Sequence, residues 1–279
     1  MSNKKISTII FFCLVLIAFG IYPCVSVALS MSQPNQNEIS AGWQEACNWL
    51  RDNTTEPSDY YALESKPTWG VMSWWDYGYW IIRDGQRPAM IDPGSNVRYK
   101  VALDLLSPNY EDVHNQLVAQ HVRYIIIDYL MVTSKYYAID TLAHEPSGEL
   151  YVPTKYQQAY EYWDQRQNQP VMLNFPDYYQ SLIVRLYNFN GLPVKSPGCP
   201  VFQTDKDKNI IHIDDFPDYQ TALAFQQKNG GIIAGSDPFL SPLAENDTLN
   251  GFNLVWQSKN MIKMGDWSYP EVKIFEVTP

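Results

Sequence analysis

The sequence has 279 residues, of which nine are Trp and 20 are Tyr, and its formal net charge is −10. This length is sufficient for one good-sized domain or two small ones. The sequence has no stretch rich in Lys and Arg that could neutralise phosphates. We therefore exclude nucleic acid as a partner.

An uncharged apolar run extends from Ile6 to about Leu29 and follows Lys4 and Lys5. As a helix it is long enough to cross a hydrocarbon core of about 30 Å. The preceding positive charges place the N-terminal end in the cytoplasm and the remainder outside. A cleaved signal peptide is the alternative, but the run exceeds the usual apolar region of about 7–15 residues.

This pattern predicts a single-pass protein of the cell membrane with a large extracytoplasmic domain. Residues 1–30 would be the transmembrane anchor, 31–39 a polar linker, and 40–279 the extracytoplasmic domain.

The elements predicted in the domain begin with a helix from Ser40 to Asp52, because Trp43, Cys47 and Leu50 recur at helical spacing. The next predictions are a strand over 69–73, a turn at 84–85, a helix over 109–121, a buried strand over 124–128 and a helix over 134–143. They are followed by helices over 153–166, 177–187 and 219–228, and by strands over 209–213, 231–235, 253–257 and 272–277. The alternation predicts a mixed α/β (α+β) fold with a helix-rich core and short strands.

Two of the four cysteines, Cys13 and Cys24, lie in the apolar run, which leaves Cys47 and Cys199 in the polar remainder. These two can form a disulfide outside the cytoplasm, or they can be free or buried thiols. The sequence contains no C-x-x-C or H-x-x-x-H pattern, so we do not expect a structural zinc site.

Two adjacent tryptophans precede a carboxylate at Trp74, Trp75 and Asp76. Each indole offers one N–H donor and no acceptor, whereas an ionised Asp offers acceptors only. Together they can surround a hydroxyl group, which both donates and accepts. A site built in this way rejects a ligand that lacks the hydroxyl, because its own polar groups would be left unpaired.

The surrounding segment, SWWDYGYWI from Ser73, resembles the WWDYG signature of oligosaccharyltransferase catalytic subunits, in its archaeal form. These enzymes transfer lipid-linked glycans to Asn in N-x-S/T sequons. The resemblance implies that Trp74 and Trp75 donate hydrogen bonds to the hydroxyl of the +2 Ser/Thr, and that Asp76 accepts one.

A second stretch, from Asp128 to Ile139, resembles the other sequon-pocket motif of this family, an Asp and a Lys followed by an apolar residue. Lys135 and Ile139 are four residues apart and would share a helical face. Ile139 would contact the methyl group of a +2 Thr, which is worth only about 1 kcal/mol. Asp128 and Lys135 are farther apart than in the closer family forms, so Met131 is a further candidate for this pocket.

The fragments 49–54, 181–191 and 272–277 also resemble this family, so the resemblance covers roughly residues 40–279. Family members use carboxylates and Mn²⁺ or Mg²⁺ in loops of a polytopic region that precedes WWDYG. The sequence has no second apolar run of spanning length, and its D-x-D, Asp205-Lys206-Asp207, follows WWDYG and is more typical of a solvated turn.

We therefore expect this chain to recognise acceptors, with neither catalytic nor metal-binding residues of its own. A separate polytopic half would bind the lipid-linked oligosaccharide. The alternatives are a truncated reading frame, a non-catalytic membrane-anchored peptide-binding or regulatory module, and an aromatic-rich sugar-binding protein. Asn53 and Asn246 begin sequons of the chain itself and are possible glycosylation sites.

Overall fold

The computed structural model describes residues 39–57, 67–96, 98–144, 158–239 and 243–279. The predicted anchor and all but the last residue of the predicted linker lie outside these ranges. Residues 1–40 and 41–279 are separate units, and every element below belongs to the second. Among the described residues, no helix has the length and apolar character needed to cross a membrane.

A four-stranded sheet forms the centre of this unit, in the order β1-β2-β11-β8. Its strands are β1 (Gly70–Met72), β2 (Val122–Asp128), β8 (Phe252–Gln257) and β11 (Val272–Val277). β1 runs parallel to β2, whereas β11 is antiparallel to both β2 and β8. All four predicted strands in these regions are confirmed, and residues 124–128 are buried as predicted.

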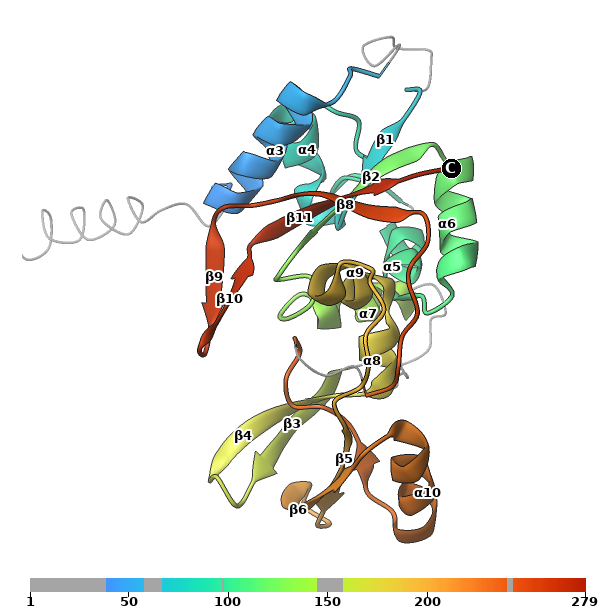
Figure 1. The fold of residues 1–279 in the computed structure, drawn as a ribbon. Helices are drawn as coiled ribbons and strands as arrows, with labels where there is room; N and C mark the ends of the chain where they lie inside the picture. The colour runs from blue at the N-terminus through green and yellow to red at the C-terminus, as the bar shows by residue number, and fades with distance from the viewer. Residues whose placement is uncertain (1–38, 58–66, 97, 145–157, 240–242) are drawn as a thin grey trace, which may run out of the picture. The chain divides into compact units, whose positions relative to one another are not determined.

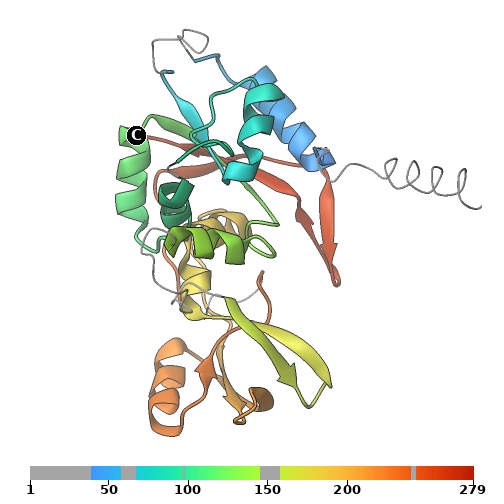
Figure 2. The same cartoon turned by 180° about the vertical axis from the view of Figure 1, so that it is seen from behind.

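Helices cover both faces of this sheet (Figures 1 and 2): α3 and α4 lie on one face, and α5, α7 and α9 on the other. This cover explains the continuous apolar run of β2. The helices are α3 (Ala41–Asn53), α4 (Gly78–Arg83), α5 (Arg98–Leu106), α6 (Tyr110–Ala119), α7 (Tyr136–His144), α8 (Pro176–Gln180) and α9 (Leu182–Phe189). α6 begins where predicted, because the Asn109 side chain accepts a hydrogen bond from the Asp112 amide.

A second sheet has five strands in the order β4-β3-β6-β5-β7. The strands are β3 (Gln158–Asp164), β4 (Gln169–Asn174), β5 (Cys199–Thr204), β6 (Asn209–Phe216) and β7 (Ile232–Ile233). The helix α10 (Tyr219–Asn229) packs against β5, β6 and β7. This sheet has its own small core of Leu173, Phe202, Ile210 and Ala234.

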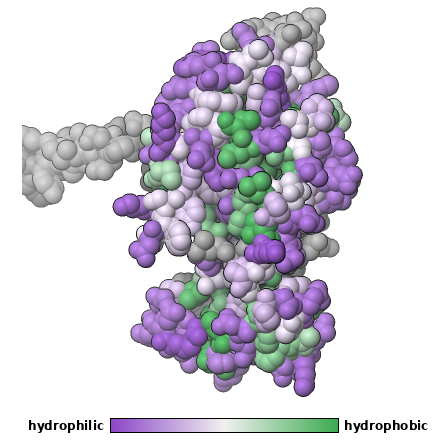
Figure 3. Space-filling model, viewed as in Figure 1, coloured by the Kyte–Doolittle hydropathy of each residue, from purple (hydrophilic) through white to green (hydrophobic). Residues whose placement is uncertain are grey.

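Between β8 and β11 the chain forms a two-stranded hairpin of β9 (Met261–Met264) and β10 (Trp267–Pro270). Figure 3 shows hydrophilic residues around most of the periphery and hydrophobic residues down the middle of the part that contains the four-stranded sheet.

The mixed α+β class is confirmed, but two local predictions are wrong and one helix was missed. Residues 158–164, predicted to be helical, form β3, whose neighbours are β4 and β6. The helix α5 was not predicted, and the helix predicted over 177–187 is interrupted at Ser181, whose ψ of 145° is extended. The core combines this sheet with buried residues of the helices that cover it.

The two cysteines of the domain do not pair. Cys47 in α3 and Cys199 in β5 are both buried, free thiols. Burial raises the pKa of Cys47 to about 12 and that of Cys199 to about 11.

Candidate functional site

The WWDYG segment lies directly after β1. The Ser73 hydroxyl donates a hydrogen bond to the carbonyl of Ile126 in β2 at 2.8 Å, which fixes the chain at the end of the parallel strand pair. Trp74 is extended, and a short 3₁₀ helix, η2 (Trp75–Tyr77), leads into α4. This change of direction points successive side chains of the motif to different sides.

The glycine of the motif permits a close backbone approach. A Cβ atom on Gly78 would lie 2.3 Å from the Ile91 carbonyl oxygen and 2.7 Å from the Asp92 Cα. Only glycine therefore allows η2 and α4 to pack directly against the backbone of residues 91–92.

The structure brings the two predicted motifs together through one ion pair. Lys135 Nζ donates to Asp76 Oδ2 at 2.6 Å, and the two side chains are 25% and 31% exposed. Lys135 lies in the turn before α7, where its amide is bonded to the Leu130 carbonyl. Its ammonium also lies 4.3 Å from the ring centroid of Tyr77. The ion pair is therefore partly exposed to solvent, and its ammonium contacts the Tyr77 ring.

The two tryptophans differ in accessibility. Trp74 is only 2% exposed, whereas Trp75 is half-buried, and their rings lie 5.8 Å apart. The guanidinium of Arg98, at the start of α5, lies 5.0 Å from the Trp75 ring centroid. Within the described part of the chain, neither indole N–H donates a hydrogen bond to a protein acceptor. Trp75 is the more accessible of the two indoles.

Asp128, which was predicted to line the sequon pocket, is buried and bonded to other parts of the chain. It is 1% exposed, its Oδ2 accepts from Trp43 Nε1 at 2.9 Å, and its Oδ1 accepts from the Met131 amide at 2.9 Å. Burial raises the pKa of its carboxyl group, although these hydrogen bonds and Lys135 oppose the shift. Asp128 thus ties α3 to the end of β2 and has no face towards solvent.

Met131 and Ile139 are also fully buried. The amide of Ile139 bonds the carbonyl of Lys135 at 3.0 Å, so the helical spacing of these two residues is confirmed. Their side chains nevertheless differ, because Lys135 reaches Asp76 and Ile139 packs in the core. Neither Met131 nor Ile139 presents a surface to a ligand in this conformation.

An aromatic cluster supports the motif from the α3 side. The Trp43 ring lies 4.2 Å from Tyr77 and 5.6 Å from Trp80, and Tyr77 stacks on Trp80 at 5.4 Å. Burial raises the pKa of Tyr77 well above its usual value, and the nearby Asp128 carboxylate raises it further. Trp43, Tyr77 and Arg98 were not predicted as site residues. Tyr77 belongs to WWDYG and Trp80 follows it closely, and only this position in the sequence could have indicated the cluster.

The D-x-D of Asp205 and Asp207 forms a turn, as predicted. Asp205 Oδ1 accepts from the amides of Asp207 and Asn209, each at 2.9 Å, and its bonds to Asn209 lower its pKa. Among the described residues, no three His, Cys, Asp or Glu side chains are grouped as metal ligands.

The two sequon asparagines differ in exposure. Asn53, the last residue of α3, is exposed. Asn246 is 7% exposed, and its backbone pairs with Val194 in both directions. In the folded chain Asn53 is therefore the more accessible of the two.

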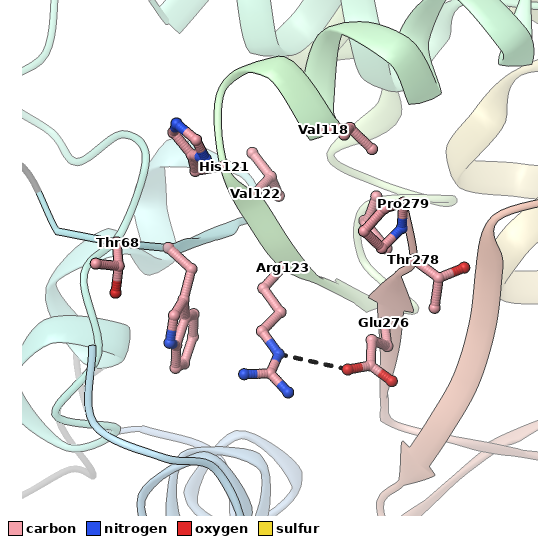
Figure 4. Close-up of a pocket in the computed structure, with 10 residues that line it drawn as sticks. Thr68, Val118, His121, Val122, Arg123, Glu276, Thr278 and Pro279 are labelled. Atoms are coloured by element: carbon pink, nitrogen blue, oxygen red, sulfur yellow. Dashed lines mark hydrogen bonds and ion pairs between the residues drawn. The ribbon is translucent and has the colours of Figure 1, made fainter. Parts of the chain in front are cut away.

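A separate cavity of about 510 Å³ lies at the opposite end of β2 (Figure 4). It is lined by Trp69, His121 and Arg123, among others, and Arg123 pairs with Glu276 across it at 3.4 Å. None of the predicted sequon-pocket residues lines this cavity.

Comparison with solved structures shows that this fold occurs in archaeal oligosaccharyltransferases. The enzyme AglB of Archaeoglobus fulgidus, in complex with an inhibitory peptide and a dolichol-phosphate, has a TM-score of 0.54 at 20% identity, covering 99% of this chain and 36% of that one. The A. fulgidus enzyme tethered by a disulfide to an acceptor peptide with the NVT sequon has a TM-score of 0.52 at 20% identity, covering 99% and 37%.

Sequence comparison gives the same class of protein. Residues 40–132 match the AglB core domain, a range that contains WWDYG and Asp128 and ends before Lys135. Dolichyl-phosphooligosaccharide-protein glycotransferase 3 of A. fulgidus is 27% identical over 223 residues, or 64% of this chain and 25% of the relative. The chain is thus similar to AglB-type oligosaccharyltransferases and spans about a quarter of the length of this relative.

Proposed function

We propose that residues 40–279 are the C-terminal, acceptor-reading part of an archaeal-type oligosaccharyltransferase for protein N-glycosylation. They would recognise the +2 Ser/Thr of an N-x-S/T sequon. The observation that carries this proposal is the meeting of Asp76 and Lys135 beside the Tyr77 ring. It supports a shared pocket for the two motifs that resemble the family.

The chemistry of this pocket suits a hydroxyl group. An ionised Asp76 offers acceptors only, and Lys135 occupies Oδ2, which leaves Oδ1 for the hydroxyl proton. The indole N–H groups of Trp74 and Trp75 would donate to the hydroxyl oxygen. A residue without a hydroxyl at the +2 position would leave these donors and acceptors unpaired, which costs about 1–3 kcal/mol per buried group.

The buried residues of the second motif would support this pocket from behind. Asp128 holds Trp43 and the Met131 amide, while Ile139 is fully buried one helical turn after Lys135. Contact of Ile139 or Met131 with the methyl group of a +2 Thr would require the segment around α7 to open.

We further propose that residues 1–30 form a single transmembrane anchor and that the domain is extracytoplasmic, on the strength of the uncharged run from Ile6 to Leu29. A polytopic membrane half would bind the lipid-linked oligosaccharide and make the glycosidic bond. The Mn²⁺ or Mg²⁺ expected for the complete enzyme would be held by that half, because neither of the motifs described here contributes a carboxylate cluster.

A reconstituted glycosylation assay tests this function. The purified full chain is mixed with lipid-linked oligosaccharide, Mn²⁺ and a labelled N-x-T peptide, with or without source-cell membranes depleted of this chain. Transfer only when chain and membranes are both present is the expected result. An N-x-A peptide is the control and should not be glycosylated.

Other outcomes lead to different conclusions. Peptide binding without transfer under either condition would favour a non-catalytic binding or regulatory module. Transfer by the purified chain alone would show that bond making does not require a separate half. Failure to distinguish N-x-T from N-x-A would refute the proposed pocket.

A further inference from the structure

The arginine that contacts the WWDYG motif has no acceptor of its own. Seven arginines occur in the sequence, and the structure describes all of them. Six donate a hydrogen bond to an oxygen of the protein: Arg51, Arg83, Arg87, Arg123, Arg166 and Arg185. Within the described part of the chain, only the Arg98 guanidinium has no such acceptor, and its contact is with the Trp75 ring at 5.0 Å. Its N–H donors are therefore open to a ligand.

Another arginine of the same chain shows how such a contact is completed. The Arg123 guanidinium lies 5.5 Å from the centroid of the Trp69 ring, and its Nε donates to the Glu276 carboxylate at 3.4 Å (Figure 4). A guanidinium that contacts an aromatic face keeps the N–H groups in its own plane for a carboxylate. Trp75 and Arg98 form the first two members of the same arrangement, and none of the described residues supplies the third.

The charge of Arg98 is not explained by the stability of its helix. Arg98 is the first residue of α5, and the first turn of this helix contains no acidic residue. A positive charge at the N-terminal end of a helix opposes the helix dipole, so a neutral Gln would be at least as favourable there. Lys135, the cation of the second motif, is balanced by Asp76. The charge of Arg98 thus stands beside Trp75 without a carboxylate from any described residue, although the net charge of the chain is −10.

The acceptor peptide can supply this carboxylate. Consecutive residues of an extended peptide lie about 3.8 Å apart. With the +2 hydroxyl bound at the Trp75 indole, an acidic side chain at the +1 or +3 position is within reach of a guanidinium that lies 5.0 Å from the same ring. The sequon Asn is one residue farther away than either of these positions.

We propose that Arg98 forms a carboxylate-binding subsite, which favours acceptor peptides with Asp or Glu immediately before or after the +2 residue. This inference rests on the proposed function, because it takes the +2 residue to be bound at Trp75. It adds a preference among N-x-S/T sequons that recognition of the hydroxyl group alone does not provide.

Peptide binding to the purified full chain tests this subsite. Fluorescence anisotropy gives the Kd of dye-labelled peptides in two matched pairs, N-E-T-A with N-Q-T-A and N-A-T-E with N-A-T-Q. Each pair differs only in the charge of one side chain. The same peptides with Ala in place of Thr report on the hydroxyl pocket separately. The variants are Arg98→Gln, Arg98→Lys and, as the control, Lys100→Gln, which removes an exposed charge from the same turn of α5.

We expect the native chain to bind the Glu peptide of at least one pair about three- to fivefold more tightly than its Gln partner, as for a partly exposed ion pair. High salt should reduce this preference. Arg98→Gln should abolish it, Arg98→Lys should retain part of it, and Lys100→Gln should leave it unchanged.

Equal affinities for Glu and Gln peptides at both positions would overturn the subsite, as would a preference that survives in Arg98→Gln. A loss of affinity in Arg98→Gln that is equal for Glu and Gln peptides would show that Arg98 only positions Trp75. A native chain that prefers Glu but does not distinguish Thr from Ala would keep the subsite and refute the hydroxyl pocket. A chain that binds none of the peptides would overturn both.

Discussion

The carboxylate of Asp76 and the ammonium of Lys135 lie 2.6 Å apart, although 59 residues separate them in the sequence. Their meeting follows from the parallel pairing of β1 and β2. Asp76 comes shortly after β1 ends and Lys135 shortly after β2 ends, and the carboxyl ends of parallel strands lie at the same edge of a sheet. The topology of two neighbouring strands thus brings the two residues together.

Lys135→Ala should impair acceptor use far more than stability. The ion pair is partly exposed, so its loss should lower the free energy of unfolding by at most about 1 kcal/mol. We expect the KM for an N-x-T peptide to rise about tenfold or more, equivalent to about 1.4 kcal/mol. Peptide kinetics and urea unfolding measure the two effects. Lys195→Ala, at an exposed lysine outside the pocket, is the control, and an unchanged KM in Lys135→Ala would contradict the assignment.

The two tryptophans of the motif should respond differently to truncation. Trp74→Ala removes a buried ring and should cost about 3–5 kcal/mol, whereas Trp75→Ala should cost much less. Trp74→Phe and Trp75→Phe keep an aromatic ring and remove only the N–H donor and part of the volume. Folded Phe variants that still discriminate N-x-T from N-x-A would rule out the indoles as hydroxyl donors.

Gly78→Ala should destabilise the motif itself. The added Cβ would meet the Ile91 carbonyl oxygen at 2.3 Å, and backbone on both sides prevents easy relief. We expect a loss of about 1–3 kcal/mol in the free energy of unfolding. Tyr79→Ala, at the adjacent and 55% exposed position, should change it by less than about 0.5 kcal/mol. Equal values for the two variants would show that the 91–92 segment moves freely.

Asp128→Ala should reduce stability by about 2–5 kcal/mol, because the Trp43 indole and the Met131 amide would each lose a buried acceptor. Trp43→Phe removes one of those donors. In a double-mutant cycle, the two changes should therefore be clearly non-additive. Additive effects in urea denaturation would indicate that the indole finds another acceptor.

Lys273 should make stability depend on pH above neutrality. Burial lowers its pKa to about 8, against about 10.4 in an unfolded chain. Between these values the unfolded chain holds a proton that the folded chain has lost, so the free energy of unfolding rises with pH. Below about pH 8 Lys273 is charged in both the folded and the unfolded chain, so its contribution to the free energy of unfolding is constant.

The buried thiols lower the free energy of unfolding as the pH rises. Cys47 and Cys199 keep protons in the folded state that unfolded thiols lose above about pH 8.5. The difference between the native chain and Lys273→Met isolates the lysine. From pH 8 to 10 the native chain should gain up to about 2 kcal/mol relative to the variant. The bonds that Lys273 Nζ donates to the Tyr187 carbonyl and to Asn190 favour the charged form and limit this gain. A constant difference would contradict the shift.

The sequence predicted the strongly periodic elements. The apolar run of residues 124–128 and the cap at Asn109 are local signals, and both are confirmed. Residues 158–164 were assigned wrongly because their strand is set by pairing with β4 and β6, which sequence periodicity does not report.

The candidate site likewise combines residues that the motifs indicated with contacts that they could not indicate. Asp76 and Lys135 were predicted from motifs, and the structure places them together. The motif could not indicate that Asp128 bonds a tryptophan of α3, because that contact spans 85 residues. The cation–π contact of Arg98 with Trp75 likewise depends on how α5 packs, and α5 was not predicted.

The position of β11 has a consequence for the order of folding. This strand lies between β2 and β8, and Glu271 immediately before it caps the start of α3. A nascent chain that has not yet reached Val272 lacks the antiparallel partner of β2, so β1 and β2 would form only a two-stranded parallel edge. The ion pair between Asp76 and Lys135 can therefore become rigid only after β11 has been synthesised, and the high sequence separation of these strands should make that step slow.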